Sequence, residues 1–273
     1  KENVAELSEV VLVGYGQKSK TTLTGSVSTV KGEELVKSPQ PNLSNSFAGR
    51  LSGVVANNRS GEPGADGATI RIRGISTTGD NNPLVVIDGI PNRLGGLERL
   101  NPNDVENITV LKDASAAIYG AQAANGVILI TTKRGKLGKP TFSVTANQGF
   151  STPANLPGLA DSPTYARILN EINFYRNPSG GMNQIYTEEE ITLFANGSNP
   201  DVYPNTSWTD EAISDWSLQD NENVSIRGGG ENFRYFTSLG RTNQDGIYKS
   251  GINNYKQVNL RANLDVDVTS NLT

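Results

Sequence analysis

Few residues in this chain have the types and spacing that catalysis requires. The 273-residue sequence contains no cysteine and no histidine, which excludes disulfides, thiolate or imidazole metal ligands, and every catalytic scheme that needs either residue. The carboxylates are scattered, and no pair stands out as an acid–base couple. Asp88, between an apolar run and Gly89, has the position of a turn residue. We therefore expect no catalytic residue, no metal site, no cofactor and no enzymatic activity.

The sequence also lacks a complete phosphate-binding motif. Gly14–Gly16 resembles the start of a dinucleotide fingerprint, but Ser19 stands where the third glycine belongs. No Walker A sequence occurs, which argues against nucleotide-driven work, and the net charge of −4 does not indicate a nucleic-acid partner. This charge is unevenly spread, because residues 1–139 carry +3 and residues 140–273 carry −7. The division near residue 139 suggests two environments.

The stretch that organises the chain is residues 101–134. Asn101 is placed to cap a helical turn, which precedes a short strand and a small-residue helix that Gly120 ends. Val127–Thr132 is apolar or β-branched at nearly every position, so both its faces are expected to be covered. The further elements predicted in residues 21–139 are strands at 27–30, 54–57, 68–73, 84–87 and 108–111, and helices at 42–51 and 113–119. Together they predict a compact α/β domain.

After residue 139 the pattern changes to strands with a period of two. In residues 257–268, apolar side chains at every second position from Val258 to Val268 alternate with polar ones. Such a run fits a transmembrane β-strand, in which about 9–11 residues cross the bilayer, and it equally fits a soluble β-sandwich. A short turn at 228–231 and a long polar segment at 151–221 favour the barrel, because barrels combine short turns with long loops. Four strands cannot close a barrel, so we expect a fragment of a longer protein.

The long polar segment is predicted to contain helices of its own. Pro163–Tyr175 has apolar residues at helical spacing, with Ser162 as the expected cap. Thr187 and Glu190 have the spacing of a capping box that starts a second helix.

The start of the chain holds an isolated apolar run, Val10–Val13, between a charged leader and a Gly/Lys tail. One interpretation is an edge strand of the following domain. The other is an extended peptide that another protein captures by strand addition, where main-chain hydrogen bonds give the affinity.

Several motifs in order then resemble one family, the SusC/RagA TonB-dependent outer-membrane transporters. The resemblance rests on the segments VVLVGYGQ (10–17), RIRG (71–74), PLVVIDGIP (83–91), LKDA (111–114), ANGV (124–127) and ITTKRG (130–135). In the second half it rests on YPNTSW (203–208), YFTSLG (235–240) and NLRANLD (259–265). These segments cover nearly the whole chain.

The resemblance implies an α+β plug domain followed by antiparallel β-strands of a truncated transmembrane β-barrel. Residues 1–18 would be the TonB box and linker, 19–139 the plug domain, and 140–273 the first part of the barrel, with a long extracellular loop at 151–221. The TonB box would be Val10, Val11, Leu12, Val13, Gly14 and Tyr15. The protein would lie in the bacterial outer membrane, in contact with its lipid, and would take no part in nucleic-acid binding.

The resemblance also implies a function: TonB-dependent active import of oligomeric nutrients, either glycans or peptides, with the plug gated by TonB pulling on the N-terminal strand. The implied partners are the periplasmic C-terminal domain of TonB, a SusD-like surface lipoprotein, and an oligosaccharide or oligopeptide substrate. Two plug loops are candidates to face this substrate. They comprise Asn58, Arg59 and Ser60 in the first loop, and Thr78, Asp80, Asn81 and Asn82 in the second. The alternative is a soluble extracellular β-sandwich that binds glycans through its Tyr-, Trp- and Asn-rich loops.

Overall fold

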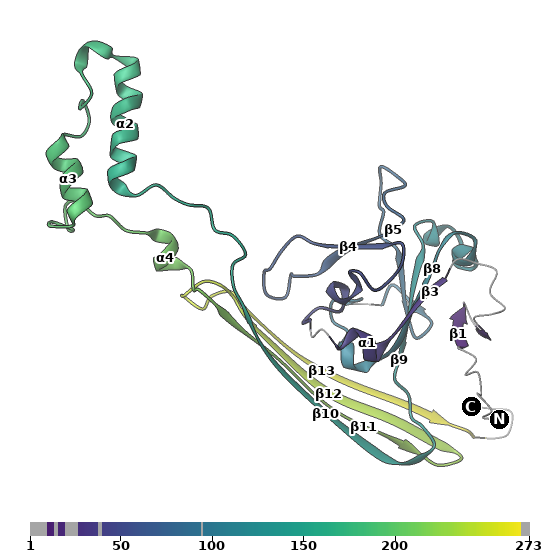
Figure 1. Cartoon of the computed structure of the whole chain (residues 1–273). Coiled ribbons are helices and arrows are strands. Elements are labelled where there is room, and N and C mark those ends of the chain that lie inside the picture. The colour runs from purple at the N-terminus through teal and green to yellow at the C-terminus, as the bar shows by residue number, and fades with distance from the viewer. Residues whose placement is uncertain (1–9, 14–15, 20–26, 38–39, 94, 269–273) are drawn as a thin grey trace, which may run out of the picture. The chain divides into compact units, whose positions relative to one another are not determined.

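A computed structural model describes residues 10–13, 16–19, 27–37, 40–93 and 95–268 (Figure 1). The chain divides into two compact units. The first comprises Lys1–Gly149, Leu218–Gly246 and Asn254–Thr273, and the second comprises Phe150–Ser217 and Ile247–Asn253. Within the first unit we distinguish an α/β domain, meaning the described residues between 27 and 137, and a sheet of four long strands.

The α/β domain is built on a five-stranded mixed sheet. Its order is β3 (Val27–Lys31), β8 (Val105–Leu111), β9 (Val127–Thr132), β6 (Leu84–Ile87) and β7 (Ile90–Pro91). The β6 and β9 strands run parallel, and the other neighbours run antiparallel. The predicted strands are therefore confirmed, with β8 starting three residues earlier than expected.

Both faces of this sheet are covered, as predicted for β9. Ile128 and Ile130 pack into one apolar core, which α1 (Gly32–Leu35), η2 (Leu43–Phe47) and the hairpin of β4 (Val54–Asn58) and β5 (Ala68–Ile72) complete. Val127 and Leu129 point into a second core on the opposite face, which η4 (Asp113–Ala123) covers. Successive residues of a strand point to opposite faces, so a strand that is apolar throughout is suited to this central place.

The short helical elements begin where the sequence predicts, but they differ in type. The side chain of Asn101 accepts a hydrogen bond from the Asn103 amide and caps η3 (Pro102–Asp104). The predicted end of the helix at Gly120 is confirmed, because this residue is non-helical, and a second short 3₁₀ turn follows it to Ala123. Gly120 has φ 69°, a conformation that glycine adopts at little cost, so the chain can bend there and resume.

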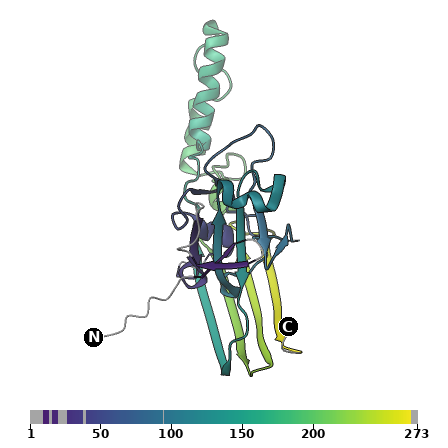
Figure 2. The same cartoon turned by 90° about the vertical axis from the view of Figure 1, so that its right-hand side faces the viewer.

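The second sheet of the unit consists of β10 (Gly138–Ser151), β11 (Ser217–Gly229), β12 (Phe233–Asp245) and β13 (Asn254–Val266), side by side in chain order (Figure 2). We call it the long-strand sheet. A tight turn, in which the Gly230 amide donates to the Phe233 carbonyl, joins β11 to β12. The predicted alternation is confirmed in β13, where Val258, Leu260 and Leu264 are 62–76% exposed.

The apolar face of the long-strand sheet is the exposed one, and its polar face is turned toward the α/β domain. In a sandwich the apolar face would be buried against a second sheet, so this arrangement does not favour the soluble alternative. Phe236 breaks the alternation of β12 because it lies on the inward face, where it is 1% exposed.

The second unit is helical. It contains α2 (Ser162–Arg176), η5 (Pro178–Gly180), α3 (Glu188–Asn196) and α4 (Trp208–Ala212). The cap predicted at Ser162 is wrong by one residue, since the Asp161 side chain accepts from the Thr164 amide while the Ser162 hydroxyl donates to the Pro204 carbonyl. The capping box of Thr187 and Glu190 at the start of α3 is confirmed. None of the helices in the described residues is long and apolar enough to cross a membrane.

Candidate functional site

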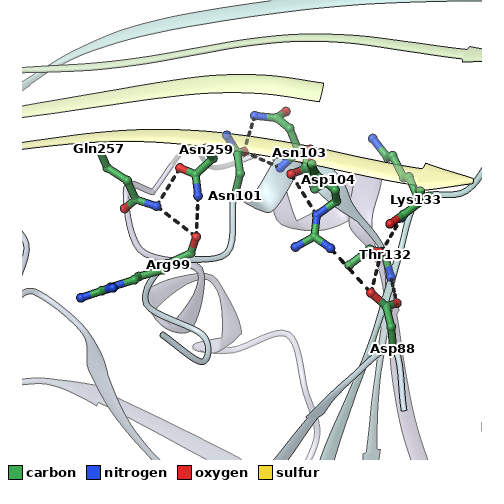
Figure 3. A network of polar contacts seen from close by, with 11 residues as sticks. Asp88, Arg99, Asn101, Asn103, Asp104, Thr132, Lys133, Gln257 and Asn259 are labelled. Carbon is green, nitrogen blue, oxygen red and sulfur yellow. Dashed lines mark hydrogen bonds and ion pairs between the residues drawn. The ribbon is translucent and has the colours of Figure 1, made fainter. Parts of the chain in front are cut away.

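The inward face of β13 carries the side chains that meet the α/β domain. Every second residue from Tyr255 to Asp265 points to this face, and all six make polar contacts across the interface or along the strand, several of which Figure 3 shows. The strict alternation of β13 places all of them on one side. This interface is the candidate site.

An arginine lies at its centre. The Nε atom of Arg261 is 3.4 Å from Oδ2 of Asp104, and its Nη1 atom is 3.6 Å from Oδ2 of Asp88. Asp104 belongs to η3, and Asp88 lies in the turn between β6 and β7 with φ 50°. One cation from the long-strand sheet therefore holds two separate segments of the α/β domain.

Asp88 and Asn263 extend the network to the end of β9. The Asp88 carboxylate accepts from the amide and the hydroxyl of Thr132, both at 2.8 Å. Asn263 donates to the Thr132 hydroxyl at 3.0 Å and to the Lys133 carbonyl at 2.7 Å. Thr132, the last residue of β9, thus bonds both to Asp88 of its own domain and to Asn263 of β13 (Figure 3).

Burial makes the charge of Asp104 costly. It raises the pKa of this carboxyl above its ordinary value, and the Ser238 hydroxyl and the Arg261 charge oppose the shift without cancelling it. Although Ser238 lies near enough to act on Asp104, neither its hydroxyl nor Oδ1 of Asp104 has a hydrogen bond of normal geometry within the described residues. Burial also lowers the pKa of Lys133, which the nearby Glu106 charge partly offsets.

Three further side chains join the α/β domain to the long-strand sheet through four hydrogen bonds. Gln257 and Asn259 both donate to the Arg99 carbonyl, at 3.0 and 2.7 Å. On β12, the Gln244 amide group accepts from the Gly64 amide and donates to Asp66, each at 3.0 Å. These contacts lie along β12 and β13, so the fastening is distributed over two strands.

Glycine allows the two backbones to approach closely at two points. A Cβ atom added at Gly240 of β12 would lie 2.3 Å from Nδ2 of Asn101. One added at Gly135 would lie 2.2 Å from the backbone nitrogen of Tyr235. Both distances are shorter than non-bonded atoms allow, so a larger residue at either position would push the α/β domain away from the sheet.

This arrangement holds the long-strand sheet and the α/β domain together. Asp88, Asp104 and Arg261 are paired with one another across the interface, and Asn263 adds hydrogen bonds beside them. Within the part of the chain that the structure describes, no group of three or more acidic side chains is arranged to hold a metal ion.

The predicted loop at Thr78–Asn82 is held by its own side chains. Asn81 is 8% exposed and makes four hydrogen bonds to the backbone of residues 76–79. The Asn125 side chain donates to the Asp80 carbonyl, and Arg71 donates to the Asn82 side chain. Thr78, Asp80 and Asn82 are exposed, whereas Asn81 shapes the loop from inside.

The other predicted loop begins at the end of β4. Asn58 and Arg59 are exposed and Ser60 is half-buried. The Asn58 side chain accepts from the Ser60 amide, and Ser60 in turn accepts from the Glu62 amide. These bonds are local, and the contact of either loop with a substrate remains a prediction.

The predicted TonB box falls partly outside the described residues, which exclude Gly14 and Tyr15. Val10–Val13 forms β1, which pairs antiparallel with β2 (Gly16–Ser19) in a sheet of its own. The interpretation as an edge strand of the following domain is therefore wrong, because β1 pairs with β2 and not with the sheet of the α/β domain. Capture of this strand by another protein is left as a prediction.

Sequence reasoning missed the central ion pairs. The helical turn predicted after Asn101 contains Asp104, Asp88 was predicted to lie in a turn, and both predictions are confirmed. The alternation of β13 places Arg261 on the polar face, but it does not reveal a partner 157 residues away. The one available signal was an arginine among neutral amides on a face expected to be enclosed.

Comparison with known proteins agrees with the geometry. Residues 19–127 match the model of the TonB-dependent receptor plug domain. TonB-dependent receptor P26 of Formosa agariphila is 38% identical over 97% of this chain and 26% of its own length. TonB-dependent receptor SusC of Bacteroides thetaiotaomicron is 37% identical over 97% of this chain and 25% of its own length.

Among solved structures, the RagAB peptide importer in its open-open state has a similar fold. It matches with a TM-score of 0.76 and 26% identity, over 96% of this chain and 31% of the compared chain. The chain thus spans about a quarter to a third of the proteins that it matches. The match covers both the α/β domain, which corresponds to the plug, and the long-strand sheet, which corresponds to part of a barrel wall. Over nearly its whole length the chain is therefore similar to a part of the SusC/RagA-type TonB-dependent receptors, and residues 19–127 match the receptor plug domain.

Proposed function

We propose that this chain is the gating part of a receptor that imports oligomeric nutrients, glycans or peptides, across the outer membrane. In this proposal the α/β domain blocks the barrel, and TonB displaces or remodels it by pulling on Val10–Tyr15. The receptor performs no bond chemistry of its own.

The observation that carries the proposal is the polarity of the long-strand sheet. Its exposed face is apolar at Val258, Leu260 and Leu264, which suits lipid. Its inward face is polar and bonded to the α/β domain through Arg261 and its neighbours. A domain fastened inside a wall by hydrogen bonds and ion pairs can be moved without exposing a large apolar core.

The N-terminal strand supports the energy-coupling step. β1 pairs with β2 through one edge, which leaves the other edge of a two-stranded sheet for a further strand. Pairing of TonB with that edge would add main-chain hydrogen bonds that can bear a pulling force.

The proposed partners follow from the relatives. The RagAB structure is named as a peptide importer, which supports a peptide as one class of cargo. The likeness to SusC and RagA supports a SusD-like surface lipoprotein as lid over the receptor. A glycan is the second class of cargo, and binding of purified full-length receptor to oligosaccharide and oligopeptide mixtures would separate the two.

Deletion of Val10–Tyr15 in the full-length receptor tests the proposal. Uptake of the cargo should be abolished, while binding of the cargo by intact cells should be unchanged. Uptake that persists without these residues would show that TonB does not act through them. Replacement of Lys18 and Lys20 by glutamine, outside the proposed TonB box, is the matched control and should leave uptake intact.

A further inference from the structure

The strand β11 carries a row of polar residues along the inward face of the long-strand sheet. Its outward face is marked by Val224, which is 49% exposed. Because side chains alternate along a strand, Asn223, Ser225 and Arg227 point inward. Asn223 is 3% exposed, and its Nδ2 atom has no hydrogen-bond partner within the described residues. We call the region where β11 faces the α/β domain the seam. It is polar, and the buried Nδ2 donor of Asn223 has no hydrogen-bond partner there among the described residues.

A cavity of about 290 Å³ opens in this seam at Arg227, against the edge of the α/β domain formed by β3 and β8. Lys31, Lys133, Lys136 and Arg227 bring four positive charges to its lining, and Glu33 and Glu106 bring two negative charges. The cavity lies at the end of the unit where β11 turns toward β12 and where residue 136 leads into β10.

The four cations of the lining outnumber its two carboxylates. Among the described residues, none of these four cations forms an ion pair with a carboxylate oxygen within 4.0 Å. Burial lowers the pKa of Lys133, the Glu106 carboxylate partly offsets this shift, and the Arg227 charge adds a smaller lowering. Like charges held together beside a water-accessible space attract an anion, which would relieve their repulsion.

We propose that this cavity, lined by Lys31, Lys133, Lys136 and Arg227, binds an anionic group such as a carboxylate, sulfate or phosphate. Arg227 supplies a planar guanidinium that can grip two oxygens at once, and the lysines supply mobile point charges around it. The volume is at the lower limit of small-molecule pockets, so one anionic unit occupies it at a time.

The inference does not depend on import, because binding of an anion to the resting receptor needs neither TonB nor transport. The anion has two possible sources. It is either a free ion of the periplasm or an acidic unit of the cargo, and the two share the same chemistry. Their separation requires probes of both kinds.

Calorimetry of the purified full-length receptor in detergent tests the proposal, at constant ionic strength with chloride replaced by the probe. The probes are sodium sulfate, sodium phosphate, a sulfated monosaccharide and the dipeptide Glu-Glu. Arg227→Gln and Lys136→Gln should each weaken binding by at least about fivefold, since each removes one charge-assisted hydrogen bond to the anion. Lys256→Gln on β13, which removes a charge outside the cavity, should leave binding unchanged.

The pattern of probes then identifies the source. Binding of the inorganic anions alone supports a free-ion site, and binding of the organic anions as well supports an acidic unit of the cargo. Absence of binding by every probe, or equal weakening by Lys256→Gln, would overturn the proposal. Thermal unfolding of each variant shows that the receptor is folded, and a separate uptake assay keeps failure of import distinct from failure of anion binding.

Discussion

The Nε atom of Arg261 lies 3.4 Å from Oδ2 of Asp104, although the two residues are 157 positions apart in the sequence. The same guanidinium reaches Asp88 at 3.6 Å. Arg261 thus joins β13 to two segments of the α/β domain, namely η3 and the turn between β6 and β7. Its loss leaves two largely buried carboxylates without their cation, which is more costly than the loss of an exposed pair.

Arg261→Gln should therefore loosen the interface. We expect the free energy of opening near Thr132 and Lys133 to fall by about 3 kcal/mol, because an unpaired buried charge is the main penalty. Hydrogen–deuterium exchange of these amides in the full-length receptor measures the change.

The control for this substitution is Arg241→Gln on β12. Arg241 pairs with Glu222 at 3.3 Å, but both side chains are about half exposed. Exposed pairs contribute about 0–1 kcal/mol, so exchange near Thr132 should not respond. Equal effects of the two variants would show that the Arg261 pairs do not hold the α/β domain.

Asp104 should make the interface more stable in acid. Burial raises its pKa in the folded chain, so the folded carboxyl binds a proton more tightly than the unfolded one. Its contribution to stability is complete below the ordinary carboxyl pKa of about 4 and is lost as the pH rises through the raised pKa.

Asp104→Asn isolates this effect, because the amide does not titrate. The stability of the parent relative to this variant should increase as the pH falls through the raised pKa of Asp104 toward the ordinary carboxyl pKa of about 4. Thermal unfolding midpoints at fixed salt, taken at each pH, give the comparison. An opposite trend would mean that Arg261 outweighs burial and lowers the pKa of Asp104.

How much of this could be read from the sequence depends on the range of the interaction. The doubly covered strand β9, the cap at Asn101 and the alternation of β13 are local patterns, and the structure confirms each of them. The pairing of Arg261 with Asp104 is set by how two distant elements pack, which no local pattern contains. The end of the first helical turn at Gly120 is a local signal too, whereas the second 3₁₀ turn that follows it to Ala123 was not predicted.

Gly240→Ala should destabilise the interface through a steric clash. The added Cβ would lie 2.3 Å from Nδ2 of Asn101, and overpacking of this kind costs about 1–3 kcal/mol. Asn101→Ser should relieve it in the double variant, since serine keeps the capping oxygen of η3 and removes the amide nitrogen. The two substitutions should therefore be non-additive in thermal unfolding, and strict additivity would show that the contact is not made.

Asn81→Ala should disorder the loop at residues 76–82. The substitution removes four hydrogen bonds from a buried side chain, so we expect a local loss of about 2–4 kcal/mol. Exchange of the Ser76 and Thr77 amides reports it. Thr78→Ala, at an exposed position of the same loop, is the control for stability, and if this loop faces the cargo it should weaken cargo binding without changing exchange.

The proposed membrane orientation places residues 151–221 outside the cell and the turn at 228–231 in the periplasm. Antiparallel strands joined in chain order cross in alternating directions, so successive connections lie on opposite sides. The chain contains no cysteine, so Asn199→Cys and Glu231→Cys each introduce one thiol into it. A membrane-impermeant maleimide applied to intact cells should label Asn199→Cys and leave Glu231→Cys unmodified, whereas both should react after lysis. Labelling of Glu231→Cys in intact cells would reverse the orientation and, with it, the side on which β1 meets TonB.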